Sequence, residues 1–366
     1  MKYPVAIPSL SGNEKKYVMD CIDTTWISSN GKYVNAFEHA FAEWLGVEHA
    51  LSCCNGTVAL HLPLLAIGIG PGDEVLVPSF TYIATANAVR YCGAKPVFVD
   101  CLPDTWNMDM EDAGRKVTPK TKAIIPVHLY GNPCDMDAVM SFAAERRLTV
   151  IEDAAECHGG LYKGKQVGSI GDFGCFSFFG NKIVTTGEGG MVTTNHPAYA
   201  DLMRRLKGQG MSPQKRFWFD MVGYNYRMTN IEAAIGLGQL ERVDEHIAAR
   251  KQVAQWYAED LADMAGCVEV QKVTPGAESV WWMFSILLTG KAKRNRDELA
   301  EILQEKGIET RPLFYPMHIM PVYEDRNANC PVCEGIAARG LNLPTHALLS
   351  REDVAYICGA IREAVL

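Results

Sequence analysis

Short apolar runs alternate with helix-like patterns along the first half of the chain, and this alternation restricts the fold more than any other feature. Two segments, residues 83–91 and 136–146, have the spacing of amphipathic helices. Apolar runs short enough to be buried strands lie around them at residues 74–77, 96–99, 123–127 and 148–151. Apolar strands separated by helices are typical of a parallel sheet covered on both faces. The sequence therefore predicts an α/β domain with a mostly parallel sheet.

The second half of the chain contains the same kinds of element in a smaller set. Thr229 and Glu232 form a capping box, which predicts a long helix from there to about Met264. Beyond residue 174, further strands are expected at 175–178, 191–194, 281–288 and 308–311, and further helices at 296–306 and after Ser350. The part beyond the long helix forms a smaller C-terminal α/β domain in this interpretation. We place the boundary near residue 245, which gives domains of residues 1–245 and 246–366.

Composition excludes several classes of protein. The 366 residues are 48% hydrophobic, carry a formal net charge of −8 and show no run of Lys or Arg, so a nucleic-acid partner is not expected. The longest apolar stretch, residues 59–70, is interrupted by His61 and Pro63 and falls short of the about 20 residues that span a bilayer. Twelve cysteines without a recognisable secretion signal suggest reduced thiols. We expect a cytoplasmic protein with no membrane partner.

Cys330 and Cys333 form a single C-x-x-C. No second pair stands at zinc-finger spacing, so the pattern favours a loop that carries two thiols around Pro331. A metal or redox role is the less favoured alternative, and no metal site is predicted.

One lysine lies in an unusual setting. Lys182 ends an aromatic run, residues 176–182, and is followed by the glycine-dense residues 185–191. A lysine beside a partly desolvated cavity can lose its proton and attack a carbonyl carbon, whereas an ordinary surface lysine stays solvated and protonated. Closely spaced glycines let the backbone approach a flat ligand. Lys182 is therefore the candidate nucleophile.

Two further motifs suit a phosphorylated ligand. Asp153 follows an apolar strand, and the carboxyl ends of parallel strands are where α/β sheets bind ligands. Asn55, Gly56 and Thr57 open a predicted helix, whose first N–H groups favour a phosphate. The alternatives are a metal-binding or helix-capping carboxylate at Asp153 and an ordinary N-cap at Asn55. Residues 223–228, with Asn225 and Arg227 among aromatics, suit anion contact or a surface turn.

Taken together, four of these segments identify a family. The segments 151–155, 177–182, 186–191 and 223–228 resemble the DegT/StrS-like nucleotide-sugar aminotransferases. These enzymes belong to the aspartate aminotransferase superfamily, which has pyridoxal-phosphate (PLP) fold type I. The resemblance runs from Pro8 to the final helix. A related dehydratase subgroup has His in place of the lysine, so Lys182 favours a transaminase.

The resemblance implies a role for each matching residue. Pyridoxal 5'-phosphate would be the cofactor, and Lys182 and Asp153 would be catalytic: Lys182 would hold the cofactor covalently and move a proton, and Asp153 would pair with its ring nitrogen. The other cofactor-binding residues would be Gly56, Thr57 and Ser177 at the phosphate, Tyr82 on the ring, Glu156 near the phenolic oxygen and Asn225. Glu156 stands where many relatives have Gln. Asn225 would reach the neighbouring subunit's cofactor, which implies a homodimer with shared active sites.

Within the family, the segments 23–29, 127–131, 134–136 and 310–316 resemble enzymes that aminate C4 of GDP-4-keto-6-deoxymannose with L-glutamate. The residues implied at the substrate are Trp26, Ser28, His128, Arg311 and His318. The alternative is amination, at C4 or C3, of a dTDP- or UDP-linked keto-sugar. Two rival classes are less favoured: a binding protein that has lost catalysis, because Lys182 and Asp153 are both present, and a metal-dependent enzyme using the strand-end carboxylates, because no His/Cys cluster stands at ligand spacing. For His158, packing or substrate contact is favoured over proton transfer.

Overall fold

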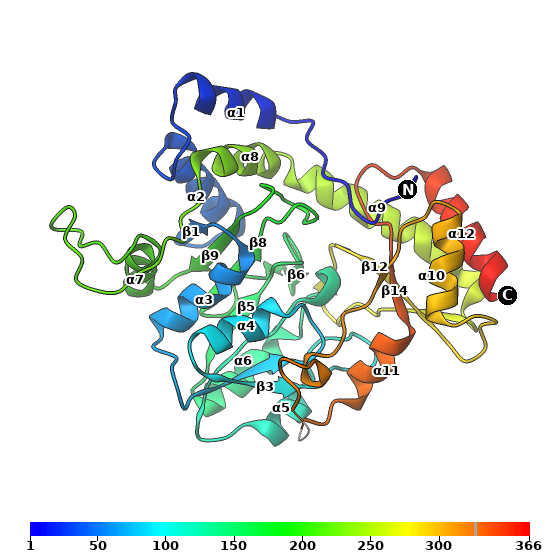
Figure 1. The fold of residues 1–366 in the computed structure, drawn as a ribbon. Helices are drawn as coiled ribbons and strands as arrows, with labels where there is room; N and C mark the ends of the chain where they lie inside the picture. The colour runs from blue at the N-terminus through cyan, green and yellow to red at the C-terminus, as the bar shows by residue number, and fades with distance from the viewer. Residues whose placement is uncertain (326–327) are drawn as a thin grey trace.

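The computed structural model describes residues 1–325 and 328–366, and its main feature is a mostly parallel sheet (Figure 1). Within this range the sheet has seven strands, in the order β1 (His49–Cys53), β9 (Gly190–Thr194), β8 (Phe173–Ser177), β5 (Thr149–Asp153), β4 (Thr121–Ile124), β2 (Glu74–Pro78) and β3 (Lys95–Val99). The pairs from β3 to β8 are parallel, while β9 runs antiparallel to both β8 and β1. The predicted fold class is confirmed, although β1 was not foreseen.

The helices of this part are α1 (Glu14–Asp23), α2 (Lys32–Leu45), α3 (Gly56–Ala66), α4 (Ala84–Tyr91), α5 (Met110–Lys116), α6 (Met136–Arg146), α7 (Pro197–Lys207) and α8 (Asn230–Leu240). Most of them cover the sheet, while α1 packs on α8 and α8 packs on α2 (Figure 1). In α2, Phe37 and Phe41 are one turn apart and fully buried. Their rings lie 5.2 Å from Phe178 and 5.0 Å from Phe176, respectively, between centroids. This aromatic packing, which buries a large apolar area, anchors the strand that leads to Lys182.

A second, smaller sheet forms the C-terminal part. Its order is β10 (Val268–Val270), β12 (Phe284–Leu288), β14 (Gly340–Leu343) and β13 (Arg311–Pro312), and the helices beside it are α9 (Val243–Leu261), α10 (Arg296–Glu305) and α12 (Arg351–Val365). The hydrophobic core is divided into two clusters, and the change occurs along α9, between Ile247 and Val253. The domain boundary near residue 245 stays a prediction, and this division is compatible with it.

Four local predictions were wrong. Of the strand expected at 308–311, only Arg311 belongs to a strand, β13, while Ile308 forms an isolated bridge with Tyr3. The helix expected from Thr229 to Met264 is broken at Glu241–Arg242, where Arg242 leaves helical geometry (φ −123°, ψ 17°), and it ends in a 3₁₀ turn at Ala262–Met264. The strand expected from residue 281 begins only at Phe284, since Trp281 has a positive φ of 51°. The segment around Pro331 is not a loop: Pro331 is the first residue of α11 (Pro331–Arg339), a position where its fixed φ favours a helix.

The remaining elements are short. A three-stranded sheet contains β6 (Leu161–Tyr162), β7 (Lys165–Gln166) and β11 (Ala277–Glu278), and 3₁₀ turns occupy Leu129–Gly131 and Met317–Ile319. Among the described residues, no helix combines the length and the apolar character needed to cross a bilayer.

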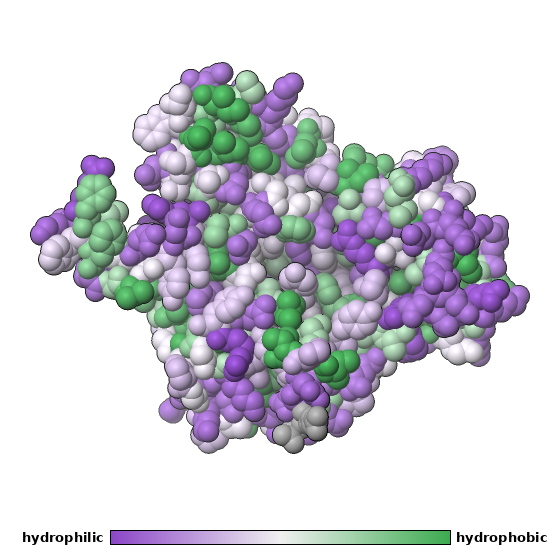
Figure 2. All heavy atoms as spheres, in the orientation of Figure 1, coloured by the Kyte–Doolittle hydropathy of each residue, from purple (hydrophilic) through white to green (hydrophobic). Residues whose placement is uncertain are grey.

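An arm between α7 and α8 extends away from the rest of the molecule (Figure 1). Its tip is held by an isolated bridge between Met211 and Phe219. Phe217, Trp218 and Phe219 are more than half exposed there. Apolar side chains are visible on the arm and near α1 (Figure 2), and exposed aromatic groups of this size commonly mark an interaction site.

Candidate active site

A cavity of about 460 Å³ opens at the carboxyl ends of β5 and β8, beside the first turn of α3. The segment after β2 and the residues around β13 complete its walls. The cavity brings together most of the predicted cofactor residues: Gly56, Thr57, Tyr82, Asp153, Glu156, Ser177 and Lys182. Its position at the strand ends is the one that parallel sheets generally use for ligands.

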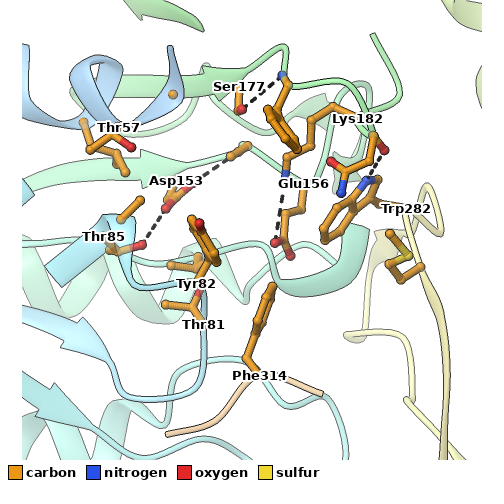
Figure 3. A pocket seen from close by; sticks show the side chains of 18 of the residues that line it. Thr57, Thr81, Tyr82, Thr85, Asp153, Glu156, Ser177, Lys182, Trp282 and Phe314 are labelled. Atoms are coloured by element: carbon orange, nitrogen blue, oxygen red, sulfur yellow. Dashed lines mark hydrogen bonds and ion pairs between the residues drawn. The ribbon is translucent and has the colours of Figure 1, made fainter. Parts of the chain in front are cut away.

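Lys182 lies in the loop between β8 and β9, with its amine pointing into this cavity (Figure 3). The Nζ atom is 3.7 Å from Oε1 of Glu156 and 3.8 Å from the ring centroid of Trp282. Burial lowers the pKa of Lys182 below 10.5, while the Glu156 and Asp153 carboxylates act in the opposite direction. The net effect is a lowered pKa, so the neutral amine, which is the form that can attack a carbonyl or accept a proton, is more accessible here than for a lysine in water.

Glu156 follows β5 in a tight turn and is almost completely buried. Its Oε2 atom accepts a hydrogen bond of 2.8 Å from the N–H of Tyr130. Burial raises the pKa of Glu156 to about 7, and the Lys182 ammonium only partly offsets this effect. Glu156 therefore holds or releases a proton close to neutral pH, right beside Lys182.

Asp153 is the last residue of β5, and its carboxylate is oriented by two donors. The hydroxyl of Thr85 donates to Oδ2 at 2.7 Å, and the N–H of Ala155 donates to Oδ1 at 3.2 Å. Burial raises the pKa of this carboxyl, and both donors oppose the shift because they favour the charged form. The arrangement supplies a fixed, desolvated acceptor for a cationic ring N–H.

The first turn of α3 and Ser177 form a small polar cradle. Asn55 caps the helix by accepting from Val58 N–H at 3.0 Å. Because Gly56 and Thr57 are the first two residues of the helix, their N–H groups have no partner inside it. Gly56 packs so tightly that a Cβ there would lie 2.6 Å from the Cβ of Ser177. Unpaired N–H groups and two hydroxyls at a helix start are suited to a phosphate.

Aromatic side chains form the opposite walls. Tyr82 is exposed toward the cavity, with its ring centroid 6.0 Å from that of Phe314. Trp282 is fixed by a 2.8 Å hydrogen bond from its Nε1 to the carbonyl oxygen of Asn181. These flat side chains in the wall suit a planar ligand.

The predicted substrate residues are only partly gathered at this cavity. Arg311 lines it, next to Glu309. Trp26 and Ser28 are exposed and lie outside its lining, as do His128 and His318, which are buried. His128 instead contacts Glu152 Oε2 at 3.0 Å and accepts from Cys134 N–H, so both of its nitrogens are occupied in the core. Asn225 is exposed on the arm segment, outside the lining, and accepts from Arg227.

Thr85, Trp282 and Phe314 were missed by the sequence analysis. Thr85 comes one turn after Tyr82, in the first turn of α4, so a polar residue there was a usable signal. Trp282 and Phe314 come from the C-terminal part; both lie in segments that the sequence analysis noted, 281–288 and 310–316, but nothing in those segments connected them with this cavity. His158, left open earlier, is fully buried between Phe176 and Phe178, and burial lowers its pKa to about 3. It is neutral at physiological pH and lies outside the cavity lining.

Comparison with known proteins agrees with this geometry. A profile of the DegT/DnrJ/EryC1/StrS aminotransferase family matches residues 8–362. The chain belongs to this family. Among its relatives, the GDP-perosamine synthases of Caulobacter vibrioides and Escherichia coli O157:H7 are 53% and 51% identical, and each match covers 99% of this chain and 98% or 99% of the relative. Spr1654 of Streptococcus pneumoniae, solved in a PMP form, superposes with a TM-score of 0.94 at 27% identity, over 100% of this chain and 98% of that one. The chain is thus an aminotransferase of this family, and the cavity around Lys182 is its candidate active site.

Proposed function

We propose that this aminotransferase transfers the amino group of L-glutamate to C4 of GDP-4-keto-6-deoxy-D-mannose, giving GDP-perosamine and 2-oxoglutarate. The observation that carries this proposal is the buried Lys182 amine between Glu156 and Trp282, in a chain more than half identical over its length to two proteins named GDP-perosamine synthase. The buried amine supports transamination, and the identity to the two synthases supports the choice of sugar nucleotide.

Pyridoxal 5'-phosphate is the cofactor we propose, because the residues present match its three chemical features. The cradle of Gly56, Thr57 and Ser177 would take the phosphate, and Asp153 would take the protonated ring nitrogen. Lys182 would take the aldehyde, and Tyr82 would cover the ring. When bound, the cofactor supplies an electron sink for the carbon that loses its proton.

Lys182 is the proton carrier in this scheme. As a neutral amine, Nζ removes the α-proton of glutamate and, in the second half of the reaction, returns a proton so that C4 of the sugar ends as a C–H bearing an amino group. Its weakened basicity, caused by burial, suits both directions of transfer. Glu156 lies close enough to accept or supply a proton as the charge of Lys182 changes.

Asp153 acts by electrostatics. Its carboxylate would keep the ring nitrogen of the bound cofactor positively charged, and a preorganised charge in a desolvated site is worth far more than one in water. Thr85 and Ala155 hold it in the required orientation.

We further propose a homodimer in which Asn225 reaches the partner's cofactor phosphate. Its exposed position outside its own cavity supports this role, since it cannot serve that cavity within one chain as described. The exposed aromatic residues of the arm support an interface in the same region.

A panel of nucleotide-linked 4-keto-sugars tests the proposal. Purified enzyme with PLP and L-glutamate is given GDP-, dTDP- and UDP-linked substrates, and products are measured by mass spectrometry. We expect the GDP-linked 4-keto-6-deoxymannose to be aminated at the highest kcat/KM. Faster amination of a dTDP- or UDP-linked sugar would overturn the substrate assignment, and no amination of any sugar would overturn the function.

A further inference from the structure

Outside the active-site cavity, one imidazole and two thiols meet in the core. Potential ligand atoms of His318, Cys330 and Cys333 all lie within 4.8 Å of one another, and all three residues are at most 3% exposed. The cysteines stand at the start of α11, where Cys330 is the N-cap, and His318 lies in the 3₁₀ turn at Met317–Ile319. Sequence spacing alone gave no reason to connect the histidine with the C-x-x-C.

The surroundings hold these groups in position. The ring of His318 is fixed through Nδ1, which lies 2.7 Å from Oγ of Ser79, and its Nε2 faces Glu334 at 3.2 Å. Asp100 clamps the first turn of α11 by accepting from the N–H groups of Val332 and Cys333, both at 2.9 Å. A hydrogen-bonded second nitrogen is the usual arrangement of a metal-binding histidine, since it fixes both the tautomer and the ring orientation.

We propose that His318, Cys330 and Cys333 bind one Zn²⁺ ion. Two thiolates and one imidazole are the ligand types that zinc prefers, and C-x-x-C at a helix start is a common way to present two of them. Tetrahedral ligands at about 2.3 Å from zinc lie about 3.8 Å apart, so closing the cluster requires movements of about 1 Å or less. The fourth position is open to water or to the Glu334 carboxylate.

Charge balance favours this occupant. On binding, each thiol releases its proton to solvent, and the two thiolates neutralise the ion. The ammonium of Lys116 already lies 3.4 Å from Cys330 Sγ and would stabilise a thiolate there. Without metal, Cys333 Sγ–H donates to the carbonyl oxygen of Cys330 at 3.1 Å, a weak interaction that a metal–sulfur bond would replace.

The site would stabilise the segment that forms one wall of the active site. Ser79, which holds His318, also accepts from Met317 N–H at 2.8 Å and lies three residues before Tyr82. Phe314, on the other side of this turn, lines the cavity. Zinc would therefore join α11 and the His318 turn to the segment after β2, and would contribute to stability without touching substrate.

Metal analysis of the full-length protein tests the proposal. Purified enzyme is incubated with Zn²⁺, dialysed, and assayed for zinc by mass spectrometry; we expect about one zinc per chain, as for a structural site with this ligand set. Cys330→Ala and Cys333→Ala should retain less than about a tenth of that amount. Cys358→Ala, which also removes a buried thiol but lies in α12, should retain all of it. Co²⁺ in place of Zn²⁺ should give the visible absorption of a tetrahedral thiolate site.

Three outcomes would overturn the assignment. They are a wild-type protein without retained zinc, variants that retain as much zinc as the wild type, and a Cys330–Cys333 disulfide found after purification without reductant. If the alanine variants fail to fold, chelator treatment of the wild type decides instead. Zinc removal should lower the Tm and added Zn²⁺ should restore it, and an unchanged Tm with no zinc bound counts against the site. None of these readouts depends on aminotransferase activity.

Discussion

The Nζ atom of Lys182 lies 3.7 Å from the Oε1 atom of Glu156, and both side chains are largely buried, with exposed fractions of 11% and 4%. Burial acts on the two groups in opposite directions: it lowers the pKa of the amine and raises that of the carboxyl to about 7. Each residue favours its neutral form more than it would in water. Burial therefore narrows the gap between the two pKa values, which suits an amine that must be basic at one step and acidic at another.

Replacing Lys182 with alanine should abolish turnover. The variant lacks both the amine that holds the cofactor and the base that moves the proton, so we expect no measurable product and no visible absorption from covalently held cofactor. Absorption spectroscopy and a glutamate-dependent assay give the two readouts. Lys165→Ala, an exposed lysine on β7, is the control and should behave as wild type. Normal turnover by the Lys182 variant would contradict the assignment.

Replacing Glu156 with glutamine should change how the stability of the cofactor-free protein depends on pH. The folded protein holds the Glu156 proton up to about pH 7, whereas the unfolded chain releases it near its ordinary pKa of 4.5. Between these values the unfolded state is favoured progressively, so the wild type loses stability as pH rises from 4.5 to 7, by up to about 3 kcal/mol. The stability of the Glu156→Gln variant should not fall in this way between pH 4.5 and pH 7. Urea denaturation of both proteins at several pH values measures it, and parallel pH profiles would refute the raised pKa.

Replacing Asp153 with asparagine should leave cofactor binding but remove its electrostatic partner. We expect kcat to fall by about 10²–10³-fold, the scale of losing one preorganised charge or donor in an active site. Cofactor titration should give a Kd close to that of the wild type. Near-normal kcat would show that this carboxylate does not act on the ring nitrogen.

Replacing Thr85 with valine tests whether the orientation of the Asp153 carboxylate matters for catalysis. It removes the 2.7 Å hydrogen bond to Oδ2 while keeping the shape of the side chain, so the charged form of Asp153 loses one of its two donors. One hydrogen bond to a charged group corresponds to a loss of about tenfold in kcat. Thr289→Val, at a half-buried position outside the cavity, is the control, because it also removes one hydroxyl hydrogen bond, to the carbonyl oxygen of Gly266. A Thr85 variant as active as this control would mean that the orientation of Asp153 does not depend on Thr85.

Local sequence was sufficient to predict the positions of the site residues that lie at the ends of strands. Asp153 ends β5 and Lys182 follows β8, so an apolar run and the polar residues after it were enough to place both at one edge of the sheet. The mostly parallel sheet followed from the same runs. The reversal of β9 could not be foreseen, because strand direction depends on pairing with β8 and β1 rather than on the residues of β9.

Contacts between residues far apart in the sequence could not be predicted from the spacing of apolar residues. Trp282 covers Lys182 from 100 positions further along the chain, and its own backbone neighbour Trp281 interrupts the expected strand. His318 meets the C-x-x-C only because a 3₁₀ turn and the start of α11 are both held to the large sheet, one by Ser79 and the other by Asp100. Such contacts depend on tertiary packing, which cannot be deduced from a single sequence.

Replacing Gly56 with alanine should weaken cofactor binding by crowding the phosphate cradle. The new Cβ would lie 2.6 Å from the Cβ of Ser177, closer than carbon atoms can approach, so the first turn of α3 or Ser177 must move. Because phosphate binding depends on N–H groups aimed at one point, we expect the Kd for pyridoxal phosphate to rise at least about tenfold, equivalent to about 1.4 kcal/mol. Gly70→Ala is the matched control, since a Cβ there meets nothing within 4 Å. Fluorescence titration of both cofactor-free variants measures the effect, and equal Kd values would place the phosphate somewhere other than this cradle.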